Sequence, residues 1–168
     1  MGTPAEVGEL IRATLAELEL EWSESAPGLF RVSLPGTRKL LTECALEVQS
    51  YGLSVRAFVA RQPDENHAAV YRWLLERNLK LYGVAFAVDA LGDIYLIGRV
   101  ALDQVTPAAI DRLLGAVAAT ADDSFNPILE LGFAESIRRE WAWRRARGEP
   151  TGNLAAFAHL DPERRPRG

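Results

Sequence analysis

Two histidines and one cysteine are the side chains best suited to catalysis or metal binding in this chain of 168 residues. His67 ends the run Asp64-Glu65-Asn66-His67, in which carboxylate, amide and imidazole groups come from one turn of the chain. The other histidine, His159, lies in the C-terminal tail, so no second imidazole faces this turn. We therefore interpret His67 as a solvated or capping histidine in the first turn of a helix.

Cys44 belongs to an alternation of inward-pointing residues that begins at Leu40 and ends at Val48. A thiol on the buried face of a strand, away from cationic groups, packs as a small hydrophobe and is chemically inert. Because it is the only cysteine, an internal disulfide and a cysteine zinc cluster are both excluded.

Paired carboxylates occur at two places, and both favour structural roles. Asp122-Asp123 precedes Pro127, which we expect to interrupt a helix because proline lacks a backbone donor and clashes one turn back. The pair then suits the N-cap of the last helix. Asp89 and Asp93 flank a glycine turn, and a calcium site would need about six oxygen ligands or more. We predict no catalytic residue, no metal and no cofactor.

Asn78 is the one polar residue on an otherwise apolar helix face. The face is defined at helical spacing by Tyr71, Leu74, Leu75, Leu79 and Tyr82. An unpaired amide is costly to bury, so we expect Asn78 to bond the backbone at the adjoining Gly83 turn or hairpin. The alternative is a ligand contact in a pocket that converges on Asn78 or Arg99.

The C-terminal segment differs in charge from the rest of the chain. Residues 1–137 carry 11 basic and 19 acidic side chains, whereas residues 138–168 carry 8 basic and 4 acidic ones. A basic arm of this kind suits an acidic partner or nucleic acid. The plainer interpretation is a solvated helix end followed by a disordered terminus.

Candidate partner-binding residues gather on the last predicted helix. Trp141 continues an apolar stripe with steps of four residues, and Trp143 lies on another face among arginines, a composition frequent at binding hot spots. For Trp143 the alternative is packing on its own helix and tail. The candidates are Phe133, Ile137, Arg138, Trp141, Trp143, Arg144 and Arg145.

Hydrophobic periodicity predicts the order helix, hairpin, hairpin, helix, hairpin, helix, helix. The strands alternate apolar and polar residues, which is typical of an antiparallel sheet covered on one side. Within the second hairpin we expect Glu43 or Glu47 to face Arg56. After this hairpin we expect Asp64 to cap the next helix. The pattern predicts a single α+β domain over residues 1–147, with helices on one face of the sheet, an extra C-terminal helix and a mobile basic tail over residues 148–168.

Composition places the chain among ordinary globular proteins, with 48% hydrophobic and 25% charged residues. No apolar run approaches the roughly 20 residues needed to span a bilayer. The acidic start of the chain, Met1 to Glu9, does not have the composition of a signal peptide. We expect a cytoplasmic protein without a membrane partner.

The central residues resemble the YbjN domain family, whose fold is similar to that of type III secretion chaperones. The resemblance rests on the runs 78–79, 84–89, 92–96, 100–102 and 106–107, and it covers about residues 4–147. Leu131-Gly132-Phe133, Glu140, Trp143-Arg144 and Asn153-Leu154 look like the actinobacterial branch. The resemblance implies an αβ protein-binding scaffold, often dimeric, with a role in signalling or regulation and with no established enzymatic activity or catalytic residues.

Taken together, the residues and the resemblance favour a non-enzymatic protein-interaction or chaperone-like regulatory module whose partner is unknown. The alternative is a regulator that contacts nucleic acid through the basic C-terminal helix and tail. The apolar stripe from Leu129 to Trp141 needs a cover, either the tail segment Leu154–Leu160 or a second subunit. The family's dimeric habit favours a homodimer, in which Arg138 and Arg145 would meet acidic residues of the body.

Overall fold

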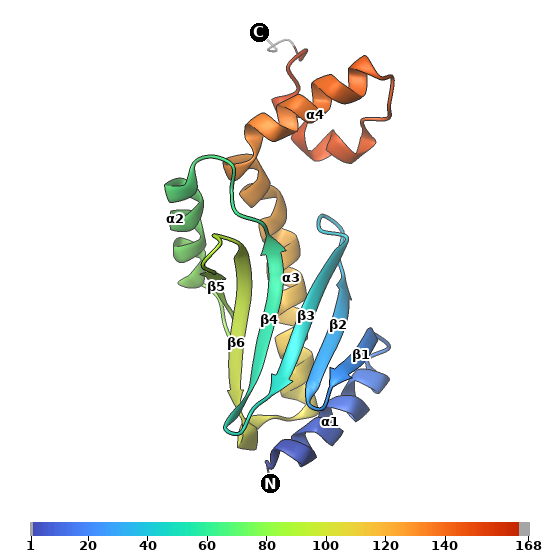
Figure 1. Ribbon diagram of the computed structural model, residues 1–168, viewed down its shortest axis with the longest axis vertical. Helices are drawn as coiled ribbons and strands as arrows, with labels where there is room; N and C mark the ends of the chain where they lie inside the picture. The colour runs from blue at the N-terminus through green and yellow to red at the C-terminus, as the bar shows by residue number, and fades with distance from the viewer. Residues whose placement is uncertain (1, 165–168) are drawn as a thin grey trace.

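Six strands of alternating polarity form one antiparallel sheet in the computed structural model, which describes residues 2–164 (Figure 1). The strands are β1 (Glu21–Ala26), β2 (Leu29–Pro35), β3 (Leu41–Val48), β4 (Gly52–Ala60), β5 (Ala85–Val88) and β6 (Ile94–Ala101). Their order in the sheet is β1-β2-β3-β4-β6-β5. The strands β1 and β2, β3 and β4, and β5 and β6 pair as three hairpins. The predicted α+β fold with a sheet built from hairpins is therefore confirmed.

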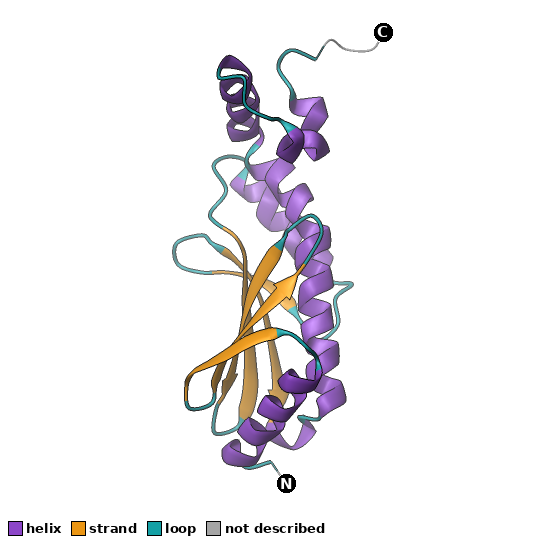
Figure 2. Ribbon diagram, turned by 90° about the vertical axis from the view of Figure 1, so that its right-hand side faces the viewer, coloured by secondary structure: helices purple, strands orange, loops and turns teal. Residues whose placement is uncertain are grey.

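Helices cover one face of this sheet and leave the other face open (Figure 2). The helices that pack on it are α1 (Pro4–Glu17), α2 (His67–Asn78) and α3 (Pro107–Gly132). Their apolar stripes meet the inward side chains of the strands, among them Cys44, Leu46 and Leu96, in one buried core. This arrangement explains the alternation in the sequence, because only one side of each strand is removed from water.

Thr3 and Thr106 are the N-cap residues of α1 and α3. Thr3 forms a capping box with Glu6, and Pro4 follows at the first helical position. Thr106 accepts a hydrogen bond from the Ala109 N–H at 3.0 Å, with Pro107 at the first helical position of α3.

The predicted break at Pro127 is wrong, because α3 continues through this residue for 26 residues in all. Ala121, Ser124 and Ile128 are buried on both sides of the proline, so packing of one continuous face offsets the lost backbone hydrogen bond. The helix ends instead at Gly132, and α4 (Ala134–Ala146) begins after Phe133. Asp122 and Asp123 therefore lie inside α3 and do not cap the last helix.

The mobility predicted for the C-terminal tail stays a prediction, but the tail contains one structured segment. A 3₁₀ segment, η2 (Gly152–Leu160), lies beside α4 beyond the end of the sheet (Figure 1). Leu154 and Phe157 of this segment are buried. The expected mobility was assigned to residues 148–168, of which 165–168 lie outside the described residues.

Two details of the second hairpin need correction. Leu40, placed on the inner face by its alternation with Cys44, lies before β3 and is 77% exposed. Arg56 faces Ala45 and not an acidic residue, and its guanidinium lies 4.0 Å from the centre of the Tyr95 ring on the open face of the sheet. Glu43 accepts a hydrogen bond from the Ser33 hydroxyl at 2.7 Å instead.

Candidate protein-binding surfaces

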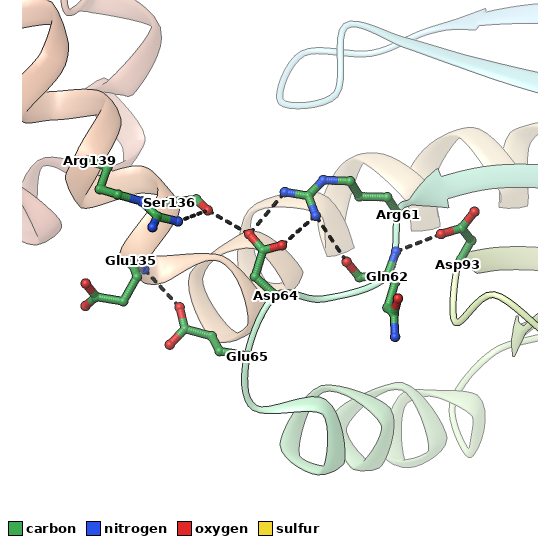
Figure 3. A network of polar contacts seen from close by, with 8 residues as sticks. All are labelled: Arg61, Gln62, Asp64, Glu65, Asp93, Glu135, Ser136 and Arg139. Atoms are coloured by element: carbon green, nitrogen blue, oxygen red, sulfur yellow. Dashed lines mark hydrogen bonds and ion pairs between the residues drawn. The ribbon is translucent and has the colours of Figure 1, made fainter.

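The linker between β4 and α2 holds the C-terminal helices against the rest of the molecule (Figure 3). Asp64 accepts hydrogen bonds from the Arg61 guanidinium at 2.6 Å and from the Ser136 hydroxyl of α4 at 2.6 Å. Glu65 accepts from the Glu135 N–H at 2.9 Å, so its carboxylate caps the first turn of α4. The backbone N–H groups of Asp64 and Glu65 donate to the Gly132 carbonyl, which ends α3.

This junction corrects the predicted role of Asp64 as the cap of α2. The residue before α2 is Asn66, in a left-handed conformation, and its side chain donates to the Leu131 carbonyl at 3.0 Å. The hydrogen bonds from Arg61 and Ser136 lower the pKa of Asp64 from 3.8 to about 2, although burial acts in the opposite direction. The carboxylate of Asp64 is therefore a structural anion that joins two parts of the chain.

The side chains first considered for catalysis are dispersed. His67 is exposed in the first turn of α2, beside the Tyr71 ring, and His159 Nε2 lies 2.8 Å from Glu130 Oε1. Cys44 is buried, and burial, followed by the nearby charge of Glu43, raises the pKa of its thiol to about 12. Within residues 2–164, no three His, Cys, Asp or Glu side chains are placed to hold a metal ion. In the same range, no helix is both long and apolar enough to cross a membrane.

Asn78 bonds the hairpin backbone, as its position on the apolar helix face predicts. Its side-chain oxygen accepts from the Phe86 N–H at 2.7 Å, and its amide nitrogen donates to the Phe86 carbonyl at 3.2 Å. The amide therefore fixes the end of α2 to β5, and both of its polar atoms are engaged within the chain.

The tail of the same chain packs against the end of the apolar stripe of the C-terminal helices. Phe133, Ile137 and Trp141 are buried, and the Trp141 indole N–H donates to the Phe157 carbonyl of η2 at 3.2 Å. The sequence predicts either the tail or a second subunit as the cover of this stripe, and in the structure the tail contacts it at Trp141. Trp141 reaches a partner only if η2 leaves α4, whereas Phe133 and Ile137 also line a groove beside the sheet.

The arginines among the candidates face carboxylates of their own segment. Arg138 pairs with Glu135, and Arg144 Nε donates to Glu140 at 2.7 Å. Arg145 pairs with Asp161 and, at 2.9 Å, with Glu163. Arg138 and Arg145 are therefore compensated within their own segment, and their contacts with acidic residues of the body in a homodimer stay a prediction.

Trp143 is the candidate aromatic residue that stays on the surface of α4. Its side chain is 46% exposed, and the Arg147 guanidinium lies 5.0 Å from its ring centre. The two residues are one helical turn apart, so this contact is local to α4.

Five further apolar side chains are exposed on α2, in the turn that follows it and in the β5–β6 hairpin. Leu75, Leu79 and Tyr82 belong to the face that helical periodicity places in the core, yet they are 67%, 88% and 91% exposed. Val88 and Leu91, at the end of β5, are exposed as well. We call these five residues the α2–β5 surface. Beside Tyr82, a hollow of about 470 Å³ is lined by apolar residues together with Arg99 and Arg112.

A groove of about 400 Å³ lies between the sheet and the C-terminal helices. Its walls come from the end of β4, from α3, α4 and η2, and from Lys39 in the β2–β3 loop; we call it the junction groove. Asp122 holds that loop, because its Oδ1 accepts from the backbone N–H groups of Thr37, Arg38 and Lys39 at 2.7–3.0 Å. These bonds lower the pKa of Asp122 even though burial, the largest single effect, would raise it.

The periodicity of single elements does not indicate this groove. It joins residues as far apart as Lys39 and Leu154, each of which has an ordinary place in its own element. Near the groove, Gly132 lets the end of α3 pack closely against the β4–α2 linker and α2. A Cβ at this position would lie 2.9 Å from the Pro63 Cβ and 3.1 Å from a Val70 methyl.

Solved structures place this architecture among the type III secretion chaperone-like folds. The ExsC–ExsE complex contains a chain with a TM-score of 0.55 and 18% identity, over 74% of this chain and 94% of that one. YbjN from E. coli aligns with a TM-score of 0.53 and 10% identity, over 69% of this chain and 89% of that one. At these identities the likeness concerns the fold.

Sequence comparison then gives the family. Residues 8–130 match YbjN, described as "Putative bacterial sensory transduction regulator", and the chain belongs to this family. An uncharacterised protein of Mycobacterium tuberculosis is 48% identical over 161 residues, covering 93% of this chain and 88% of that protein. A Mycobacterium leprae protein is 50% identical over 142 residues, covering 83% of this chain and 77% of that protein. The resemblance inferred from the sequence is thus confirmed.

Proposed function

We propose that this chain is a non-enzymatic protein-binding module with a regulatory role, and that it acts as a homodimer. The observation that carries the proposal is the α2–β5 surface, where Leu79 and Tyr82 are almost fully exposed. Large apolar side chains gathered on one surface mark a site of protein contact. A cytoplasmic location belongs to the same proposal, and the single unpaired thiol supports it.

The shape of the α2–β5 surface supports pairing with a second copy. It combines one helix with a sheet edge, and the apolar hollow beside Tyr82 offers space for a large side chain. In a two-fold arrangement each subunit presents the same surface, so Tyr82 of either copy can enter the hollow of the other. Arg99 and Arg112 also line this hollow, so charged groups lie beside its apolar walls.

No observation favours the nucleic-acid alternative. Arg138, Arg144 and Arg145, on which it depends, are each paired with a carboxylate of the C-terminal segment. A phosphate backbone would have to displace those carboxylates, which reduces the attraction that uncompensated arginines would provide.

Sedimentation velocity of the full chain and of two leucine variants tests the proposal. We expect the wild type to be dimeric at micromolar concentration and Leu79→Asp to be monomeric, because the charge would lie within the interface. Leu40→Asp is the matched control, since Leu40 is comparably exposed but lies in the β2–β3 loop. A monomeric wild type, or a Leu79→Asp variant that remains dimeric, would contradict a dimer through this surface.

A further inference from the structure

The junction groove lies where the family fold meets the C-terminal extension. The match to the YbjN family ends at residue 130, within α3, whereas Ile137 and Leu154 of the groove come from α4 and η2. Phe58, Phe125 and Leu129 supply the opposite walls. The groove thus exists because the extension lies at the end of the sheet, and its lining residues are separate from those of the α2–β5 surface.

Among the charged side chains that line the groove, Lys39 is the one without a direct ion pair in the described residues, although the nearby charge of Glu43 acts on it. Arg61 is neutralised by Asp64, and Glu140 by Arg144. Lys39 Nζ donates to the Leu41 carbonyl at 3.0 Å and lies 5.4 Å from the centre of the Phe125 ring. In the described part of the chain its ammonium group makes no ion pair. A ligand carboxylate at this place would gain a charge-assisted hydrogen bond beside apolar walls.

The apolar surface continues from the groove onto the open face of the sheet. The Phe58 ring meets the Tyr95 ring edge-on at 5.6 Å, and Arg56 lies over the same tyrosine. Arg56 is opposite Ala45 on one neighbouring strand and Ile97 on the other, so no acidic residue lies directly across from it. A second cation, which makes no ion pair among the described residues but lies diagonal to Glu43 and Glu47 of β3, therefore accompanies the aromatic strip that leads out of the groove.

We propose that the junction groove and the adjoining Phe58–Tyr95 strip bind an acidic, apolar segment of a partner protein. The inference rests on the proposed protein-binding function and specifies the chemistry of the partner. An apolar side chain of the segment enters the groove beside Leu129, and carboxylates on the segment pair with Lys39 and Arg56. A basic segment would be repelled by both cations, so charge selects the partner. The open strip beyond the groove favours an extended segment over a small molecule.

Selection from a library of short random peptides displayed on phage, with the full chain immobilised, tests this proposal. We expect enrichment of peptides that carry Asp or Glu beside Phe, Leu or Trp. The enriched peptides are then synthesised, and their affinity is measured by fluorescence anisotropy. Lys39→Glu should weaken binding about tenfold or more, since a charge-assisted contact becomes repulsive. Phe58→Ala should weaken binding as well, because Phe58 joins the groove to the strip.

Lys80→Glu is the matched control, because Lys80 is exposed beyond the end of α2 and does not line the groove. Equal thermal unfolding temperatures for wild type and variants establish that the variants are folded. Enrichment of neutral or basic peptides, or affinities unchanged by Lys39→Glu and Phe58→Ala, would overturn the proposal.

Two outcomes separate this proposal from the proposed function. Peptides whose binding is lost in Leu79→Asp but retained in Lys39→Glu would overturn the junction groove and leave protein binding in place. If no peptide is enriched, the groove proposal falls, and the sedimentation experiment on the α2–β5 surface decides the protein-binding function independently.

Discussion

The side-chain amide of Asn78 pairs with both backbone groups of Phe86, accepting its N–H at 2.7 Å and donating to its carbonyl at 3.2 Å. A further strand beside β5 would offer the Phe86 N–H and carbonyl the same two hydrogen-bond partners. The Asn78 side chain therefore takes the place of one residue of such a strand at this edge of the sheet. This explains how a polar residue is retained on the apolar face of α2.

Asn78→Leu should lower the free energy of unfolding by about 1–3 kcal/mol, because the Phe86 backbone groups lose their partners while the helix gains only an apolar side chain. The urea midpoint of the purified variant measures this change. Leu75→Ala, at an exposed position of the same helix, is the control and should have a much smaller effect. An unchanged midpoint in Asn78→Leu would contradict the role assigned to the amide.

Gly132→Ala and Gly115→Ala should change stability in opposite directions, although both lie in α3. A Cβ at Gly132 meets Pro63 and Val70, so the substitution should cost about 1–3 kcal/mol through overpacking. A Cβ at Gly115 meets no atom within 4 Å, and alanine should stabilise the helix by about 0.5–1 kcal/mol. Thermal or urea unfolding of the two variants measures the direction of each stability change. A Gly132→Ala variant as stable as wild type would show that the junction is loosely packed.

Cys44 should react slowly with thiol reagents in the folded protein. The thiol is buried and its pKa is raised to about 12, so the reactive thiolate is scarce and inaccessible at neutral pH. Labelling with a chromogenic disulfide reagent, with and without urea, measures the difference. Modification as fast in the native protein as in urea would mean that β3 is open to solvent.

Acid should weaken the junction between the linker and α4. Because the folded-state pKa of Asp64 is about 2 and its ordinary value is 3.8, its carboxylate stabilises the fold above 3.8. That contribution is lost as the pH falls from 3.8 to about 2. Asp64→Asn should therefore be less stable than wild type at neutral pH, and the gap should narrow across this acidic interval. Urea midpoints of wild type and Asp64→Asn, measured at neutral pH and across this acidic interval, test whether the stability difference narrows. Asp111→Asn, at an exposed position of α3, is the control.

The sequence was sufficient for features that depend on neighbouring residues. Alternation along each strand predicts the covered sheet, and Thr106-Pro107 predicts the start of α3, because both signals act within a few residues. Asn78 was predictable for a related reason: a single amide on an apolar face must bond something close to it, and β5 follows α2 after a short turn.

Features that depend on distant residues were not predictable in this way. Helical spacing identifies an apolar face on α2, but whether Leu75 and Leu79 are covered depends on where the sheet ends. Local rules place a helix break at Pro127, whereas α3 ends at Gly132, where it packs against Pro63 from a distant part of the sequence. The junction groove combines five separate elements, so no local pattern marks it.

The Asn78–Phe86 pairing has a consequence for aggregation. Fibril growth by strand addition needs two free sheet edges on every molecule, one to attach and one to extend. In this sheet a strand added along β5 would first have to displace the Asn78 amide, which leaves β1 as the edge with exposed backbone. Edge pairing through β1 alone stops at two molecules, and the glutamates of β1 discourage even that step. One asparagine thus limits how far misassembly of this sheet can spread.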